Sequence, residues 1–579
     1  MRSGHIRGLR DATPKFSFGG PVIGNTLYLW QSADYSLEKK QVRTLSFPHN
    51  ESKVESINSF SQLDYIQSPQ HFLTGTLHVM PRHINFYDPQ FFNPQPVSPS
   101  FRGFQRAWSV IDHSSTQLGL VESTITRQAF RARVGSQGTD EMVMTPTGNT
   151  GNYFANQTRA SSRLEWLEQL SRDVKYWGLR ELKLGSIIAR TATGGDFAFR
   201  PVEIRNNERR PIQRIEYVGG APFEHSDVEH SFFAQGHWAG ANTLAADGGL
   251  RVEHQTKTST WRIAPRLGIV WTPSYAGGIV IRSGAGVFYD RVPLAVYAFS
   301  QYPQQVITSY DASGEPEAKP RHFLNLIATQ AGRRFRMLKS QEKSGNFAPY
   351  SETWTAEVEK VLSRIIHLRV GYQHSSAGGG ILVVPRTFGS GGALVLEGNG
   401  RSRYQQLEIT ANLSLREGQQ MFFSFVHSKT RGDLNVFNSY VSDYPMLPVR
   451  PNIYSNVPGD LPNRFLSWGL VNMPWKLRLA PIVEYRTGAP YAVLDAARNY
   501  VGIPYDDTTR LRNYFAVDVR VSKEIRTISK YKARISISVL NLTNHFNSLD
   551  VNANTADPQF GTLFGHYKRR YRFDFEILF

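Results

Sequence analysis

The last residues of the chain alternate between hydrophobic and polar side chains. The hydrophobic positions are Tyr571, Phe573, Phe575, Ile577 and Phe579, and Arg572, Asp574 and Glu576 stand between them. Successive side chains of a β-strand point to opposite faces, so a period of two predicts a strand with one apolar and one polar face. The apolar face is almost entirely aromatic, which is typical of a strand with lipid on one side and water on the other.

The same alternation recurs in at least four other segments, within residues 366–373, 406–415, 476–486 and 515–522. Each is about 8–11 residues long, which is the length that a tilted strand needs to cross a bilayer. The polar faces of two of them carry Glu408 and Asn412, and Asp518 and Arg520. Residues 162–173 alternate as well, although Ser162 and Glu165 also fit the start of a helix. We interpret this segment as a strand.

The connections between these segments alternate in length. Short connections are expected near residues 238–243, 272–278, 362–365, 416–420, 473–475 and 524–531, and long ones near 191–230, 290–352, 375–403, 428–463, 487–512 and 541–565. Tight turns on one side and large loops on the other are typical of a bacterial transmembrane barrel. The pattern therefore predicts an all-β fold, a large antiparallel transmembrane β-barrel of about 22 strands with long extracellular loops. The final strand would run toward the side of the short turns.

Composition agrees with this prediction. The chain has 579 residues, 12% of them aromatic, and a mean hydropathy of −0.37. No run of about 18 apolar residues is present, so no transmembrane helix is predicted. There are 0 cysteines, which excludes disulfides and thiolate metal sites. The net charge of +18 comes from scattered lysines and arginines rather than a basic run. We therefore expect no nucleic-acid partner, and anionic lipid head groups would suit the charged rims.

Motifs for catalysis are weak. Residues 283–287, SGAGV, resemble part of a dinucleotide loop but lack its third glycine, so we interpret them as a strand that thins a barrel wall. Residues 340–343 have Ser-x-x-Lys spacing without its partner motifs. The histidines, among them His78, His237 and His367, show no metal-binding spacing. We expect no enzyme activity, no catalytic residue, no cofactor and no metal.

Several segments in order resemble the β-barrel of TonB-dependent receptors, especially the Oar-like branch. They are residues 19–30 (GGPVI followed by LYLW), 232–253 (FFAQ, Trp238 and GLRVE), 265–290 (PRLG and GAGVFYD), 460–465 (DLPNRF), 487–491 (TGAPY) and 541–547 (NLTNHFN). The terminal Phe579 is similar to the signal that the barrel-assembly machinery reads. In this resemblance Tyr571, Phe573, Phe575, Ile577 and Phe579 form that C-terminal signal.

The resemblance implies an outer-membrane receptor that takes up a bulky nutrient, such as a siderophore, glycan or peptide, driven through TonB. Glu408, Asn412, Asp518 and Arg520 would then face a plug domain or the ligand in the lumen. The implied partners are outer-membrane lipid, the plug and TonB, the assembly machinery and an unidentified ligand, and we expect a monomer. Residues 1–15 would be at most the remnant of the plug–barrel link, and residues 16–579 the barrel.

The family begins with a signal sequence, a TonB box and a plug, none of which is recognisable near Met1. We therefore expect a truncated chain, in which one outward strand before Lys15 is missing. Two other functions stay open. One is a plug-less pore, or a barrel for surface adhesion. The other is a soluble all-β binding protein.

Overall fold

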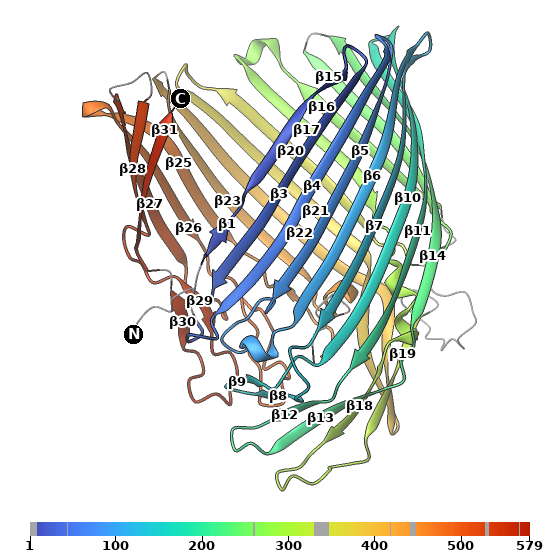
Figure 1. The fold of residues 1–579 in the computed structure, drawn as a ribbon, viewed down its shortest axis with the longest axis vertical. Coiled ribbons are helices and arrows are strands. Elements are labelled where there is room, and N and C mark those ends of the chain that lie inside the picture. The colour runs from blue at the N-terminus through green and yellow to red at the C-terminus, as the bar shows by residue number, and fades with distance from the viewer. Residues whose placement is uncertain are drawn as a thin grey trace.

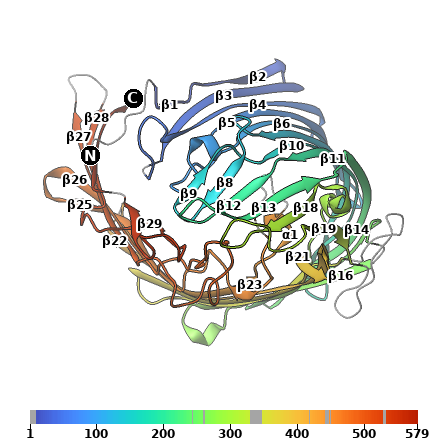
Figure 2. The ribbon, with the colours of Figure 1, turned by 90° about the horizontal axis from the view of Figure 1, so that it is seen from below.

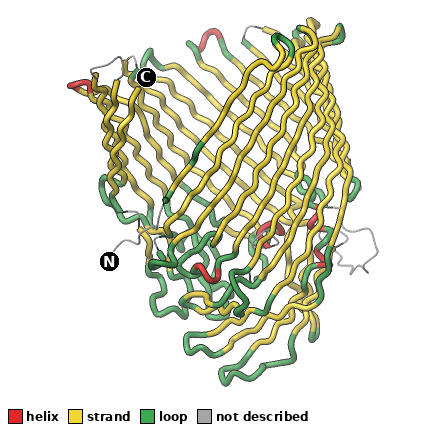
Figure 3. Tube along the Cα trace, in the orientation of Figure 1, coloured by secondary structure: helices red, strands yellow, loops and turns green. Residues whose placement is uncertain are grey.

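Strands make up most of this computed structural model. It describes residues 9–42, 44–241, 243–258, 261–328, 347–416, 418–440, 447, 449–526, 532–566 and 568–578. They form a 29-stranded sheet and a 2-stranded sheet of β29 (Ser548–Val551) and β30 (Leu563–His566). Figure 3 shows that helix is confined to short pieces, such as α1 (Phe437–Tyr440). In the described part of the chain, no helix is long and apolar enough to span a membrane.

Twenty-one of the described strands run side by side and form a curved wall (Figure 1). They are β2 (Lys15–Ile23), β3 (Leu27–Gln41), β4 (Glu51–Ser68), β5 (His71–Asn85), β6 (Ser100–Thr116), β7 (Gly119–Gly135), β10 (Ala155–Tyr176), β11 (Leu179–Phe199), β14 (Phe223–Ala241), β15 (Leu244–Gln255), β16 (Trp261–Trp271), β17 (Ile279–Tyr289), β20 (Tyr350–Val361), β21 (Ile366–Phe388), β22 (Gly391–Arg416), β23 (Gln419–Asp433), β25 (Asn463–Met473), β26 (Leu477–Arg486), β27 (Tyr514–Arg526), β28 (Lys532–Leu540) and β31 (Arg570–Leu578). The antiparallel barrel wall predicted from alternation is confirmed. Residues 162–173 lie within β10, so the strand interpretation of that segment is correct.

The two ends of the wall differ as the connection lengths predicted. Six of the short turns fall between β14 and β15, β16 and β17, β20 and β21, β22 and β23, β25 and β26, and β27 and β28. We call this end the turn side and the opposite end the loop side. The C-terminus lies on the turn side, at the top of Figure 1.

The final strand shows how alternation builds the wall. Phe573 and Phe575 of β31 are 74% and 67% exposed and pair with Ile537 and Ile535 of β28, which are also exposed. We take this apolar side as the outward face. Glu576 lies on the other, inward face. The side chain of Ile577 and all of Phe579 lie outside what the structure describes.

The first and last wall strands leave a seam. Within the described residues, β2 and the short strand β1 (Asp11–Ala12) both pair with β3, and β31 pairs with β28. Both β2 and β31 run from the loop side to the turn side, so a direct pair between them would be parallel. One further strand would restore antiparallel order. The strand expected before Lys15, and the division at residues 15 and 16, therefore stay predictions.

The loop side carries a cap that the sequence did not reveal. Segments expected as long loops contain strands β12 (Val202–Arg205), β13 (Pro211–Val218), β18 (Gln304–Ser309) and β19 (Arg321–Ile327), and β21 and β22 continue through residues 375–403 as one long hairpin. These segments are long connections on the loop side, as predicted, but they contain paired strands as well as irregular loops. Strands β8 (Met142–Thr145) and β9 (Gly148–Thr150) complete the cap, which spans the mouth in Figure 2.

The cap strands pair with distant segments. β12 pairs with β8 in parallel and with β13 antiparallel, and β19 pairs with β22 in parallel. Two apolar clusters fix this sheet against the wall. One contains Phe197, Val296 and Phe299, and the other contains Val202, Ile204 and Ile215, each at most 6% exposed. Full burial of such side chains contributes about 1.5–3 kcal/mol each, so the cap is a packed layer.

Candidate functional site: a hollow in the lumen wall

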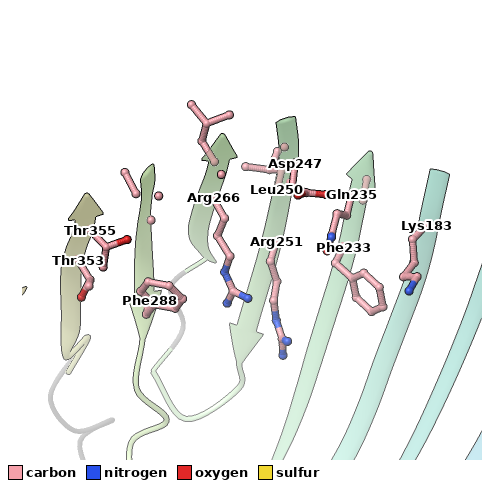
Figure 4. A pocket seen from close by; sticks show the side chains of 18 of the residues that line it. Lys183, Phe233, Gln235, Asp247, Leu250, Arg251, Arg266, Phe288, Thr353 and Thr355 are labelled. Carbon is pink, nitrogen blue, oxygen red and sulfur yellow. The ribbon is translucent and has the colours of Figure 1, made fainter. Parts of the chain in front are cut away.

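The inward face of the wall has a hollow of about 560 Å³ across β11, β14 to β17 and β20 (Figure 4). Its lining includes the cationic or polar side chains of Lys183, Gln235, Asp247, Arg251, Arg266, Thr353 and Thr355, together with the aromatic rings of Phe233 and Phe288. The floor consists of glycines. The hollow therefore presents mainly positive and hydrogen-bonding groups to the lumen.

Glycines create the space. Gly268 of β16 lies directly opposite Gly284 of β17, so two facing positions lack side chains. A Cβ added at Gly268 would meet Asp247 Cβ only at 3.9 Å, and one at Gly284 would meet Thr355 at 3.5 Å. Larger residues would therefore fit and fill the hollow. Gly284 belongs to the SGAGV motif, whose interpretation as a wall strand is confirmed because it lies in β17.

The charges of the hollow are only partly compensated. Arg251 forms an ion pair with Glu253 at 2.5 Å, and Asp247 contacts His237 at 2.8 Å. Arg266 instead stacks over the ring of Phe288, with 4.7 Å from guanidinium carbon to ring centroid. Among the described residues, no carboxylate forms an ion pair with Arg266. Because a guanidinium offers up to five donors in a planar fork, Arg266 can bind an anionic group in the lumen.

A second hollow of about 410 Å³ lies nearer the cap on the same inward face. Arg163 and Arg291 both bind Glu229, at 2.9 and 3.1 Å. Arg262 is only 4% exposed, and its guanidinium donates hydrogen bonds of 3.0 Å to the carbonyl oxygens of Asp290 and Phe347. These bonds attach both ends of the segment between β17 and β20 to the wall.

The residues proposed from sequence to face the lumen lie elsewhere. Glu408 and Asn412 share a face of β22, where Glu408 is 3.5 Å from Arg369. Asp518 accepts a hydrogen bond of 2.7 Å from the backbone N–H of Asn541, and Arg520 is 3.1 Å from Glu576. None of the four lines either hollow described above. Their contact with a plug or ligand stays a prediction.

The arginine and glycine residues of the hollow were missed by the sequence interpretation. The one available signal was the pair of glycines at residues 284 and 286. It indicated a thin wall, but it did not predict the arginines that border the space. Among the described residues, no group of three or more His, Asp or Glu side chains could hold a metal ion. His78, His237 and His367 lie in strands β5, β14 and β21. Residues 340–343 fall outside the described residues.

Comparison with known proteins agrees with this architecture. Residues 216–379 match the family described as "Outer membrane beta barrel domain". They include the strands that form most of the hollow. The wall has outward apolar and inward polar faces, as a barrel in a membrane needs. The chain has the fold of an outer-membrane β-barrel. It lies in the bacterial outer membrane, and Arg266 and the other inward side chains of the two hollows stand on its lumen side.

Solved structures of outer-membrane receptors have the same fold. The outer membrane transporter YddB from Escherichia coli is 12% identical, with a TM-score of 0.65, over 98% of this chain and 75% of that chain. A mutant of the ferric enterobactin receptor PfeA from Pseudomonas aeruginosa is 14% identical, with a TM-score of 0.63, over 98% of this chain and 78% of that chain.

The siderophore receptor PirA from Acinetobacter baumannii is 11% identical, with a TM-score of 0.63, over 98% of this chain and 77% of that chain. At such identities the similarity concerns the fold. No curated protein matches the sequence.

Proposed function

We propose that this barrel takes up a bulky anionic nutrient of the ferric-siderophore type, as part of a TonB-dependent receptor. The observation that carries the proposal is the cationic hollow around Arg266 in a capped lumen wall. Relatives of the same fold are receptors and transporters, and one is described in complex with enterobactin. No covalent chemistry is proposed for the barrel, and its proposed role is non-enzymatic.

The positive charge of the hollow favours an anionic ligand over a neutral glycan. Three cations, Lys183, Arg251 and Arg266, line it against the single carboxylate of Asp247. A charged ligand gains most from donors that hold no carboxylate already, and Arg266 is such a donor. The plug and TonB are proposed as partners from the family resemblance. Glu408, Asn412, Asp518 and Arg520 are proposed to face the plug.

Uptake of ⁵⁵Fe-labelled ferric enterobactin tests the proposal. Cells that produce the native protein should accumulate label, and a protonophore should abolish the accumulation because it removes the energy that TonB transmits. Arg266→Gln should raise the apparent KM, whereas Arg478→Gln should not, since Arg478 lies away from the hollow and pairs with Glu524 at 3.1 Å. If the accumulation of label is the same with and without the protonophore, the alternative function, a passive pore, is indicated. Absence of protein-dependent accumulation would overturn the ferric-siderophore assignment.

A further inference from the structure

The outward face of the wall carries an uncompensated group of arginines on β6, β7 and β11. We call it the outer arginine patch, and it consists of Arg102, Arg106, Arg127, Arg131, Arg133 and Arg190. All six are exposed. Among the described residues, none of the six forms an ion pair with a carboxylate. The patch is therefore a set of free guanidinium groups on a surface where charge is costly.

The burial of alternate residues on β7 fixes the direction in which the patch faces. Ala132 and Val134 are 7% and 2% exposed, and Val134 belongs to the apolar cluster beneath the cap. Arg131 and Arg133 stand at the alternate positions and are exposed. Because side chains of a strand alternate between faces, the arginines point away from the lumen. The register between neighbouring strands places the arginines of β6 and β11 on this same outward face.

The patch lies at the loop-side margin of the membrane-facing surface. On the same outward face the strands carry Trp108, Ile125, Leu164 and Ile188, which are 37–47% exposed. Trp108 and Leu164 lie directly opposite Arg127, and Ile125 and Ile188 lie one step nearer the turn side. This apolar band is the part that contacts lipid chains. The arginines continue the same faces toward the loop side, with Arg106 two positions from Trp108 and Arg127 two positions from Ile125. The patch therefore lies where lipid head groups meet the barrel.

Within the patch like charges are placed close together. Arg102 and Arg133 lie directly opposite each other across the β6–β7 ladder. Arg127 and Arg190 lie on either side of Leu164, each directly opposite it. Like charges in directly opposed positions destabilise a sheet, because their Cβ atoms are about 5 Å apart. An anion between such arginines would offset that repulsion.

A hollow of about 510 Å³ lies among these arginines. Arg106, Arg127 and Arg131 border it, and small residues leave its floor open: Ala129, Ala160, Ser162, Ala192 and Gly194. Glu224 also lines it, as its one carboxylate. The hollow is large enough for a phosphorylated sugar or glycerol head group, and three guanidinium groups border it.

We propose that the outer arginine patch binds the phosphorylated head group of a membrane lipid in the leaflet on the loop side. Arginine forms bidentate hydrogen bonds with phosphate and is less strongly hydrated than lysine, which suits a site at the edge of a membrane. The phosphate would lie in the hollow, and the acyl chains would lie along the apolar band beside Trp108 and Leu164. This site is on the outer surface and does not depend on the proposed uptake function.

The test is a binding titration of the delipidated full chain in neutral detergent. The probes are diphosphoryl lipid A and the same lipid after enzymatic removal of its phosphates. Arg127→Gln/Arg131→Gln should weaken binding of the phosphorylated lipid at least about tenfold, since hydrogen bonds between charged partners are the strongest class. Arg172→Gln/Lys360→Gln removes the same charge at the turn-side margin and should bind as the native protein does.

Three results would overturn the proposal. These are equal affinity of the native protein for the two lipids, unchanged affinity of the Arg127/Arg131 variant, and full competition by inorganic phosphate at the concentration of the lipid. The last result would identify a site for the free ion. If the variant does not fold, as judged by heat-modifiable gel migration, the native protein still decides the question. Its preference for the phosphorylated lipid must fall as ionic strength rises.

Discussion

The guanidinium of Arg498 donates a hydrogen bond of 2.5 Å to the carbonyl oxygen of Thr145, and another of 3.1 Å to the side chain of Asn149. Arg498 and Thr145 are 353 residues apart in the sequence and meet over the mouth of the barrel. Rings of Phe91 and Phe564 make a second such contact, with centroids 4.6 Å apart. The cap is therefore held by contacts between early and late loops.

Replacement of Arg498 should loosen the cap. Burial lowers the pKa of Arg498 to about 10, and nearby Arg450 adds to this effect. Arg498→Gln removes both hydrogen bonds to residues 145–149, each worth about 1–3 kcal/mol when a buried partner is left unpaired. Proteases added to intact cells should then cleave residues 136–150 faster. Lys319→Gln, an exposed change on the same cap, is the control, and equal cleavage of both variants would contradict the role of Arg498.

The loop around Asp507 should respond to acid. Arg510 lies 2.7 Å from Asp507 and 2.5 Å from the buried Asp460. The hydrogen bond from Arg510, and its charge, hold the pKa of Asp507 below its ordinary value of 3.8. Because the folded pKa is the lower one, Asp507 stabilises the folded loop above about pH 4, and this contribution is lost as the pH falls through the folded pKa.

The measurement for this prediction is protease resistance of residues 487–513 between pH 2.5 and 7. The native protein should be more resistant than Asp507→Asn at neutral pH, and the difference should vanish at the acidic end. A difference that persists unchanged at pH 2.5 would contradict the assignment. The effect should be small, because Asp507 is largely exposed and water screens its pair.

Filling the lumen hollow should impair uptake without preventing folding. Gly268→Leu places a side chain in the space that Gly268 and Gly284 leave open, and the nearest atom to its Cβ is at 3.9 Å. Gly248→Leu is the matched control: the backbone of Gly248 borders the hollow, but Gly248 pairs with the outward Leu267, so its new side chain would point away from the lumen into open space. Both variants should show heat-modifiable migration, and only Gly268→Leu should reduce ⁵⁵Fe accumulation. If both variants take up ⁵⁵Fe equally well, the hollow is not part of the transport path.

The turn side should face the periplasm. The chain contains 0 cysteines, so a single introduced cysteine reports one position. Lys319→Cys lies on the cap and Ser274→Cys lies in the turn between β16 and β17; both positions are exposed. A membrane-impermeant maleimide should label the first in intact cells and the second only after the outer membrane is opened. The reverse pattern would invert the orientation.

The aromatic face of the last strand should be needed for assembly. Phe573→Lys puts a charge on the lipid-facing surface, at a cost of up to about 2–4 kcal/mol depending on depth. The amount of heat-modifiable protein in the outer membrane should therefore fall. Arg572→Gln alters the opposite face of β31 and serves as the control. If the two variants assemble equally well, the proposed role of Tyr571, Phe573, Phe575, Ile577 and Phe579 as an assembly signal is wrong.

The wall could be predicted because its signal is local. Each wall strand can be recognised from alternation over about ten residues, and strands that follow one another in the sequence are neighbours in the sheet. The cap could not be predicted in this way. β8 and β12 pair in parallel across more than fifty residues, and β19 pairs with β22 across a similar interval. Nothing within either segment indicates its partner.

The two hollows could be predicted from the sequence only in part. Alternation predicted the polar faces of β22 and β27, including Glu408 and Asp518, but it did not predict which polar residues surround a cavity. The lumen hollow exists because Gly268 and Gly284 come into register on adjacent strands. The outer arginine patch exists because Arg102 and Arg133 do the same on β6 and β7. A shift of one residue in either register would reverse the face on which these side chains stand.

The sequence by itself therefore determined the class of fold, the direction of the last strand and the division into short turns and long connections. Those properties depend on the period of the side chains and on distances along the chain. Only the tertiary structure decided that the long connections form a packed cap, and where uncompensated arginines gather. Both depend on pairing between segments far apart in the sequence, which the alternation within each strand does not encode.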